Sequence, residues 1–451
     1  MRKSALFLSL LLILTALFPC LSASAFTPSD FEVTASSAML VNIDSGDVVY
    51  SKNTDSRQYV GAISNLMTAL VVCDNVADID NTFITIDKKL LDHFLGSGAA
   101  MSHFSAGQSC SVRMLLQFLL VSSGSDAALI LADYVGGGDY LAFVDMMNDK
   151  ADKLGMDGTN YVVPYGLYED EQYSTAADTY KLMTAAFKND DILSICSMSR
   201  FTADANEIYS ARAVVTTNYL VNKVSNYYYR YAVAGKTGYT DAGGMCIASM
   251  ASKDGVSYYC ILLGCPKTVN GESVRVDMTE SIKLYKWAFS SFSFKTVTEK
   301  GEPIVGIDAD GNTVGGVNVD LSWQTDYLQL YAANTVVALM PNDADRTSVI
   351  FEIDLQHDVY DAPIKSGDLL GTASIVYGGE KIGEVGLVAA DSADYSFTLH
   401  VIRGIKWMCS TVIARLLLIV LALGIILGII FIIISNRRRK RRNRLRMYKR
   451  L

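Results

Sequence analysis

The sequence predicts an α/β domain that is followed by an all-β domain and a C-terminal transmembrane helix. Three observations carry this prediction. Helical and strand patterns mix up to about residue 294, short alternating strand patterns follow, and one uncharged apolar run lies near the C-terminus. The segment before the apolar run is too long for a single hydrophobic core, which favours two domains.

The first domain is predicted to contain one antiparallel sheet and a helical lobe. Period-2 patterns and turn residues predict strands at 38–43, 48–52, 232–235, 245–252 and 257–264. Apolar residues with a period of 3.6 predict helices at 63–71, 114–120, 126–135, 140–154 and 277–292. Because the strands come from both ends of the domain with the helices between them, we expect one sheet, with a site in the cleft beside the helices.

The second domain is predicted to begin near residues 294–302. Alternating runs at 315–321, 349–355 and 372–388 indicate strands, and Gly378-Gly379 is typical of a hairpin turn. The predicted domains are therefore 26–295 and 296–405.

The two ends of the chain carry membrane-related signals. Residues 1–25 resemble a secretory signal peptide, with Arg2 and Lys3 before an apolar run and small residues at 23–25. The uncharged run 416–434 would reach about 28 Å as a helix, so we predict a transmembrane helix at 413–435. The tail 436–451 holds ten Lys or Arg and no acid, which predicts a cytoplasmic tail and places 26–410 outside the cell membrane. A specific partner or lipid site for this tail is the alternative to a topology signal.

Charge and cysteine content limit the function. Removing the ten tail cations, Arg2 and Lys3 from the net charge of −8 leaves −20 for residues 4–436, which argues against nucleic acid as a partner. The spacing of the cysteines and of the four histidines matches no metal site, and we predict neither metal nor cofactor. We expect the external cysteines to be buried thiols, with disulfides as the alternative.

A Lys-Thr-Gly motif at 236–238 carries the functional signal. Segments elsewhere agree with it in order: 42–46, 66–70, 126–128, 135–137 and 173–176. Together they resemble the D-alanyl-D-alanine carboxypeptidases, which are serine-type penicillin-binding proteins with a β-lactamase/transpeptidase-like fold. The resemblance covers about residues 38–292 and, more loosely, 362–390. It implies a role in peptidoglycan metabolism with stem peptides ending in D-alanyl-D-alanine as partners.

The Ser-x-x-Lys motif that acylates in this family is degenerate here. Counting back from the matching segment 66–70, the resemblance places Ala62 at the nucleophile and Asn65 at the base. A methyl group cannot form an ester and a carboxamide is not a base, so the resemblance implies a lost reaction. Ser64 is rotated about 200° from Ala62 on a helix and is expected to face elsewhere.

The second family motif, Ser-x-Asn, is read here as Ser123-Gly124-Ser125. Its serine survives, and a shorter hydroxyl side chain replaces the amide. Ser125 is assigned to the substrate site, and its alternative reading is a helix cap for the segment that starts at Asp126.

The binding half of the family's site is present. The resemblance implies that Lys236 attracts the terminal carboxylate, that Thr237 donates its hydroxyl to it, and that Gly238 admits a ligand backbone. The backbone N–H of Ala62 keeps an oxyanion donor. A strand that retains these residues for packing alone is the competing interpretation.

Four tyrosines precede the Lys-Thr-Gly strand: Tyr227, Tyr228, Tyr229 and Tyr231. They are interpreted either as the lining of a groove for glycan or peptide or, with more weight, as edge packing of a strand.

Three hypotheses remain open, and with them the question of whether the protein is an enzyme. The first is a membrane-tethered pseudoenzyme that binds stem peptides and regulates or scaffolds cell-wall proteins. The second is an active carboxypeptidase with Ser123 as nucleophile and Lys236 as base. The third is a structural stalk whose cleft binds nothing.

Overall fold

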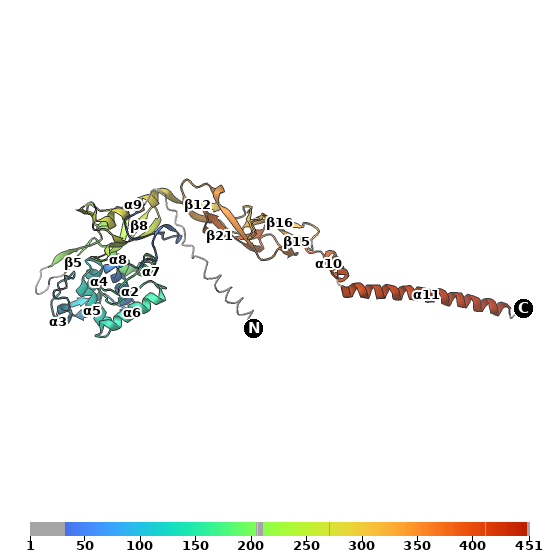
Figure 1. Cartoon of the computed structure of the whole chain (residues 1–451), viewed down its shortest axis with the longest axis horizontal. Coiled ribbons are helices and arrows are strands. Elements are labelled where there is room, and N and C mark those ends of the chain that lie inside the picture. The colour runs from blue at the N-terminus through green and yellow to red at the C-terminus, as the bar shows by residue number, and fades with distance from the viewer. Residues whose placement is uncertain (1–31, 204, 206–210, 270, 411, 449–451) are drawn as a thin grey trace, which may run out of the picture. The chain divides into compact units, whose positions relative to one another are not determined.

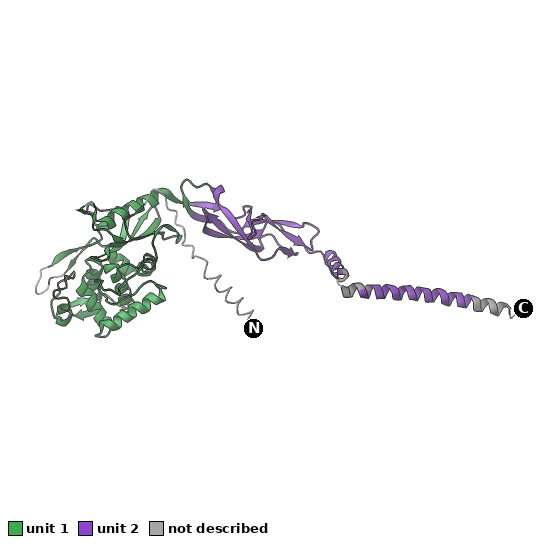
Figure 2. Ribbon diagram, in the orientation of Figure 1, with its two compact units in different colours: residues 1–294, 339–344 green, residues 295–338, 345–451 purple. Residues whose placement is uncertain are grey.

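The computed structural model describes residues 32–448 apart from 204, 206–210, 270 and 411. The predicted signal peptide lies outside the described residues. The chain divides into two compact units, residues 1–294 with 339–344 and residues 295–338 with 345–451 (Figure 2).

Unit 1 contains a five-stranded antiparallel sheet in the order β2-β1-β9-β8-β7. Its strands are β1 (Ser37–Asn42), β2 (Val48–Lys52), β7 (Ala232–Thr240), β8 (Gly244–Lys253) and β9 (Val256–Cys265). The predicted antiparallel sheet, with strands from both ends of the domain, is confirmed. Strand β7 continues past its predicted end at residue 235, because Lys236, Thr237 and Gly238 pair in register with Ala248, Ile247 and Cys246 of β8.

The predicted hairpin between β8 and β9 is also confirmed. Asp254 and Gly255 form its turn with φ of +52° and +85°. Two central residues with positive φ match the twist of the flanking strands, and aspartate followed by glycine adopts this conformation readily.

A helical lobe covers one face of this sheet. Its helices are α2 (Asn65–Asn75), α3 (Lys88–Asp92), α4 (Val112–Val121), α5 (Ser125–Val135), α6 (Tyr140–Lys153), α7 (Ala176–Ala186) and α8 (Asp190–Cys196). Helix α9 (Val276–Ser291) packs on the other face, against β8 and β9 (Figure 1). The apolar residues accordingly form two cores, one on each side of the sheet. The lobe also holds short two-stranded sheets, β3 (Phe83–Thr85) with β4 (Ser109–Ser111) and β5 (Arg200–Ala203) with β6 (Arg212–Val215).

The start of α2 is held against β7 by a short 3-10 turn, η1 (Gly61–Ser64). Gly61 has φ of +55°, and a Cβ at this position would lie 2.8 Å from the backbone nitrogen of Tyr239. Both facts require glycine. Helix α2 then runs through the core with its first eight residues buried. This packing fixes the head of α2 at the edge of the sheet.

Unit 2 is all-β before its C-terminal helices, which confirms the predicted fold class. Its long strands are β15 (Gly316–Asp320), β16 (Tyr327–Ala332), β18 (Ile350–Leu355), β20 (Leu369–Tyr377) and β21 (Glu380–Ala389). They belong to an eight-stranded sheet with the short strands β13 (Gly306–Ile307), β14 (Thr313–Val314) and β19 (Val359–Asp361). Gly378 and Gly379 join β20 to β21 with φ of +61° and +90°, which confirms the predicted hairpin. The chain leaves unit 1 along strand β12 (Phe292–Thr298). It comes back to unit 1 along β17 (Val336–Pro341), which pairs with β12.

The chain ends in two helices, α10 (Phe397–Ser410) and α11 (Val412–Tyr448). Within the described residues, Ile419–Lys440 forms a stretch of α11 that is long and apolar enough to cross a membrane, and none of it is buried. The bent pair α5 and α6 passes the same composition test, but its apolar side chains are buried in the core of unit 1. Helix α11 is therefore the stretch that could anchor the chain.

The cysteines described in unit 1 are free thiols, and all but Cys73 are buried. Burial raises the pKa of Cys196, Cys246 and Cys260 to about 12, which keeps these thiols protonated and unreactive near neutral pH. The prediction of buried thiols is confirmed for five of these six cysteines and is wrong for Cys73, which is half-buried.

Candidate functional site

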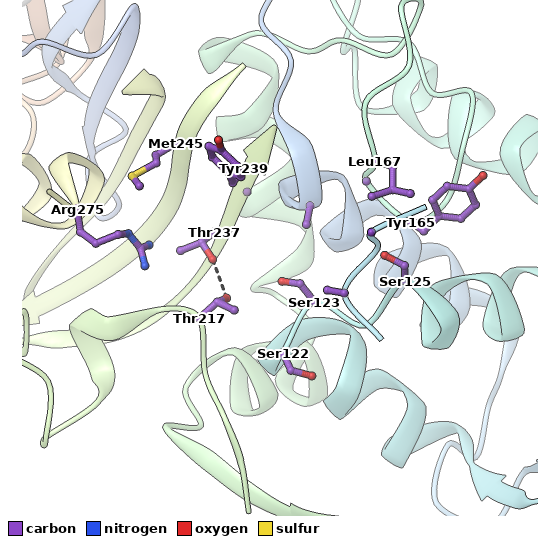
Figure 3. A pocket seen from close by; sticks show the side chains of 15 residues that line it. Ser122, Ser123, Ser125, Tyr165, Leu167, Thr217, Thr237, Tyr239, Met245 and Arg275 are labelled. Atoms are coloured by element: carbon purple, nitrogen blue, oxygen red, sulfur yellow. Dashed lines mark hydrogen bonds between the residues drawn. The ribbon is translucent and has the colours of Figure 1, made fainter. Parts of the chain in front are cut away.

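A cavity of about 430 Å³ opens between the sheet and the helical lobe of unit 1 (Figure 3). Five of the seven sequence-predicted site residues line it: Ala62, Ser123, Ser125, Thr237 and Gly238. The other two, Asn65 and Lys236, do not line it and have no exposed surface. The structure thus brings all three motifs together, with two of their residues behind the cavity wall.

Ala62 stands on the cavity wall in the η1 turn, directly before α2. The backbone around it is tightly packed, since a Cβ on Gly166 would lie 2.6 Å from Cα of Ala62. On the other side, a Cβ on Gly238 would lie 2.1 Å from the carbonyl oxygen of Val60 and 3.1 Å from the nitrogen of Ala62. Gly238 therefore leaves room for the backbone of residues 60–62, and it also lines the cavity. Its access to a ligand backbone stays a prediction.

Neither Asn65 nor Ser64 lines the cavity. The Asn65 amide donates a hydrogen bond of 3.4 Å to the carbonyl of Leu119 in α4, while its Oδ1 atom has no partner among the described residues. The Ser64 hydroxyl donates to the carbonyl of Gly61 at 3.1 Å and satisfies the short turn. Neither side chain can take a proton from a group in the cavity.

Ser123 lies in the turn between α4 and α5 with φ of +61°. A non-glycine residue in this region is uncommon and costs on the order of 1 kcal/mol. Ser102 packs directly against this turn at Gly124, where a Cβ would lie 2.1 Å from Oγ of Ser102. The strained backbone aims the Ser123 hydroxyl at both the cavity and β7.

Ser125 is the first residue of α5, and its N-cap is Gly124 without a side-chain hydrogen bond. The alternative reading of Ser125 as a helix cap is wrong. The buried carboxylate of Asp126 instead ties this turn to the neighbouring loop, with both oxygens accepting from the backbone nitrogen of Ser102 at 2.9 Å. Burial raises the pKa of Asp126.

Lys236 extends from the middle of β7 toward Ser123. Its Nζ donates to Oγ of Ser123 and, at 2.9 Å, to the carbonyl oxygen of Thr237. Burial lowers the pKa of this amine to about 8, because the charged form loses its hydration. A substantial fraction of Lys236 is therefore neutral just above physiological pH.

Thr237 follows on the same strand and faces the cavity. Its hydroxyl donates to Oγ1 of Thr217 at 2.6 Å, as the dashed line in Figure 3 shows. The two hydroxyls form a polar strip on the sheet side of the cavity. Ser123 and Ser125 lie on the lobe side of the cavity, whereas the Ser122 hydroxyl donates to the carbonyl of Phe118 in its own helix at 3.0 Å.

Arg275 is the cavity residue that the sequence analysis missed. It precedes α9, lines the cavity on the sheet side, and forms two hydrogen bonds of 2.9 and 2.6 Å with the buried carboxylate of Asp277. Its guanidinium also lies 4.7 Å from the ring centre of Tyr219. It lies 38 positions after Thr237 and 37 after Gly238 in sequence. An isolated Arg-x-Asp is not a recognised motif, so only the fold brings Arg275 to the cavity.

Arg275 is the cationic side chain on the cavity wall. Burial acts to lower its pKa, but the hydrogen bonds and charge of Asp277 outweigh this effect and raise it. The guanidinium is therefore permanently charged and held in one orientation. Such a group is suited to a carboxylate ligand.

The described residues hold no group of three or more His, Cys, Asp or Glu side chains placed to bind a metal ion. The polar groups that converge on the cavity are hydroxyls, backbone amides and the Arg275 guanidinium.

A serine turn that faces a Lys-Thr-Gly strand across a cavity is the arrangement of the serine-type penicillin-binding fold, and it places this chain in that structural class. Residues 24–267 match the D-alanyl-D-alanine carboxypeptidase family, and the chain belongs to that family. Residues 294–394 match the C-terminal domain of penicillin-binding protein 5.

Relatives match half of the chain or more. D-alanyl-D-alanine carboxypeptidase DacF of Bacillus subtilis is 26% identical over 383 residues, which cover 82% of this chain and 90% of the relative. A D-alanyl-D-alanine endopeptidase of Escherichia coli is 33% identical over 228 residues, covering 50% of this chain and 70% of the relative.

Solved structures share the fold. The carboxypeptidase DacD of Francisella tularensis superposes with a TM-score of 0.63 at 23% identity, over 82% of this chain and 96% of that one. The DD-transpeptidase of Streptomyces K15 has a TM-score of 0.52 at 26% identity, over 58% of this chain and 99% of that one. The first of these likenesses concerns the fold alone.

Proposed function

We propose that this protein is a membrane-anchored member of the carboxypeptidase family that binds D-alanyl-D-alanine stem peptides outside the cell membrane without forming an acyl-enzyme. The observation that carries the proposal is the placement of Ala62. It occupies the cavity wall at the head of α2, where the family resemblance places the nucleophile. A methyl group has no lone pair with which to attack a carbonyl.

Asn65 supports the same conclusion. A lysine at this position would supply the base, but the amide is buried, bonds to Leu119 and does not line the cavity. In another serine hydrolase, loss of nucleophile or base costs on the order of 10⁶ in turnover. Turnover through position 62 is therefore expected to be negligible.

The binding half of the cavity supports a ligand with a free carboxylate. Arg275 offers a fixed guanidinium on the wall, and the Thr237 and Thr217 hydroxyls lie on the same side. Lys236 is buried behind Thr237, and we assign the direct contact with the carboxylate to Arg275. Lys236 would then contribute its charge through the Thr237 carbonyl and Ser123.

The relatives are named for acting on D-alanyl-D-alanine, and their names support a role for this chain in peptidoglycan metabolism. Helix α11 would hold both units at the membrane, and the basic residues that follow its apolar part favour a cytoplasmic C-terminus. We also propose other cell-wall proteins as partners. A protein that binds stem peptides without cleaving them would act by bringing such partners to the peptides.

A second candidate function rests on one specific observation. Ser123 faces the cavity, and its hydroxyl is hydrogen-bonded to an amine whose pKa is lowered to about 8. A neutral Lys236 could accept the Ser123 proton as the hydroxyl attacks a peptide carbonyl. This would be a carboxypeptidase with a relocated nucleophile.

Incubation of the full-length protein in detergent with a labelled penicillin tests the proposal. We expect no covalent adduct, and we expect reversible binding of a D-alanyl-D-alanine peptide that weakens in Arg275→Gln. A stable adduct that disappears in Ser123→Ala would establish the second candidate in its place. Absence of peptide binding would leave a structural stalk and contradict the proposal.

A further inference from the structure

A second cavity, of about 450 Å³, lies elsewhere in unit 1 and shares no lining residue with the first. The segment before β7, the β8–β9 hairpin and the C-terminal half of α9 form it. Its size is within the roughly 300–1,000 Å³ of ligand-sized pockets. The residues that matter for its chemistry are Tyr228, Arg230, Tyr231, Lys253, Lys286 and Phe289.

Aromatic rings form part of its wall. The ring centres of Tyr231 and Phe289 are 6.2 Å apart, and those of Tyr229 and Tyr231 are 5.6 Å apart. Tyr229 is 7% exposed and packs into the core, whereas Tyr228 is 38% exposed at the cavity. The tyrosine segment therefore fits both interpretations of the sequence. Tyr229 packs into the core, and Tyr228 lines a cavity where a ligand could reach it.

Three cations surround these rings. The guanidinium of Arg230 lies 5.2 Å, and the amine of Lys253 5.6 Å, from the ring centre of Tyr231. Lys286 adds an exposed amine from α9. No carboxylate of the described residues forms an ion pair with any of the three, although other lysines of unit 1, such as Lys150, are paired.

These three cations belong to a chain that is otherwise acidic. Residues 4–436 carry a net charge of −20 once the twelve terminal cations are set aside from −8, so acidic side chains are available to neutralise an exposed amine. Three unpaired cations around one cavity repel one another, and a bound anion would relieve that repulsion. The cavity lining therefore selects for negative charge.

We propose that this second cavity binds an anionic glycan. The exposed ring of Tyr228 would pack against a sugar ring, and Arg230, Lys253 and Lys286 would bind the carboxylate or phosphate groups that the glycan carries. Amphipathic aromatic rings offer an apolar face to a ring with a polar edge, and the cations supply charge-assisted hydrogen bonds. The strongly acidic remainder of the external chain disfavours a nucleic acid in this place. The site does not depend on whether the first cavity binds or cleaves a peptide.

Calorimetric titration of the full-length protein in detergent micelles tests this assignment. The probe is hexagalacturonate, which combines sugar rings with carboxylates. The comparison ligands are maltohexaose, which keeps the rings without charge, hexaglutamate, which keeps the charge without rings, and a hexathymidylate. We expect hexagalacturonate to bind about tenfold more tightly than each of them and to weaken as salt is raised. Equal binding of maltohexaose, hexaglutamate or the oligonucleotide would overturn the assignment to an anionic glycan.

Variants then locate the site. Lys253→Gln with Lys286→Gln should weaken hexagalacturonate binding about tenfold, since two charge-assisted contacts are lost, and Tyr228→Ala should weaken it through the lost ring contact. The matched control is Lys188→Gln with Lys223→Gln, two exposed lysines of the same unit outside the cavity lining. All three proteins should keep the thermal transition of the parent, because the changed residues are partly or fully exposed. A loss in the control as large as in the cavity variant would show binding elsewhere and overturn the site.

Discussion

The Lys236 amine donates a hydrogen bond to the Ser123 hydroxyl, and this contact joins strand β7 to the turn before α5 across 113 residues of sequence. The amine has no exposed surface and bonds otherwise to the carbonyl of Thr237. Among the described residues, these two groups are its hydrogen-bond partners, and burial lowers its pKa. A perturbed pKa beside a cavity is a recurrent property of functional sites. The contact is also the feature on which the two candidate functions differ.

The first prediction concerns pH and the second candidate function. If Ser123 attacks with Lys236 as base, D-alanine release from a pentapeptide should rise with pH and level off above about 8, because only the neutral amine accepts the proton. Ser123→Ala should remove this activity at every pH. A release that is flat from pH 6 to 9, or that survives in Ser123→Ala, would rule out this pair of residues.

The same pKa predicts a pH dependence of stability. Burial lowers the Lys236 pKa from 10.5 to about 8, so between these values the unfolded chain binds a proton that the folded chain does not. The free energy of unfolding should therefore rise with pH across this window, on the order of 3 kcal/mol for the full shift. Below about pH 8 both states are protonated and the burial cost is constant.

Urea unfolding of the parent and of Lys236→Met at pH 7.5 and 9.5 measures this term. The variant has no amine to desolvate and should show a smaller rise between the two pH values. Other groups that titrate in the window, such as exposed tyrosines and lysines, contribute equally to both proteins. An identical rise in the two proteins would contradict the lowered pKa.

Much of the fold could be predicted from local patterns, because the turns at Gly46, Gly255 and Gly378 and the period of the helices are encoded within a few residues. The site could be predicted only where a motif carried it. Ala62, Ser123 and Thr237 were found through the resemblance, and the structure places all three on one cavity.

The sequence could not predict how deeply a side chain is buried or which distant residues it contacts. Nothing local distinguishes Lys236, which is buried, from Arg275, which lines the cavity, since the difference arises from where the fold places β7 and the residue before α9. The sequence also contained no sign that the carbonyl of Val60 lies directly beside Gly238 in the fold.

The third prediction restores the missing groups. Ala62→Ser with Asn65→Lys should give a protein that labelled penicillin acylates, because position 62 is on the cavity wall and position 65 lies one helical turn along the same helix start. Ala62→Ser alone should label at most weakly, since it lacks the base. A double variant that folds but does not label would mean that the other cavity groups no longer hold the carbonyl in place.

The fourth prediction concerns Arg275. Arg275→Gln should weaken binding of a D-alanyl-D-alanine peptide at least tenfold, since a charge-assisted hydrogen bond contributes about 1.5–3 kcal/mol. The substitution also leaves the buried carboxylate of Asp277 without its partner, and the fold could suffer. Arg275→Lys keeps the charge and loses the two-point geometry, so it should retain the fold and show intermediate affinity. Unchanged affinity in both variants would remove Arg275 from the site.

The last prediction concerns the packing that shapes the cavity. Gly238→Ala would place a Cβ 2.1 Å from the Val60 carbonyl oxygen and 3.1 Å from the Ala62 nitrogen, and both are backbone atoms that cannot rotate aside. The η1 turn must then move away from β7, and the free energy of unfolding should fall by about 1–3 kcal/mol. Ala242→Gly, a change of the same size on an exposed residue four positions along, is the control and should cost less than about 1 kcal/mol. Because η1 carries the cavity wall, Gly238→Ala should also weaken peptide binding, and a variant with parent-like stability and affinity would show that the turn is not held in this way.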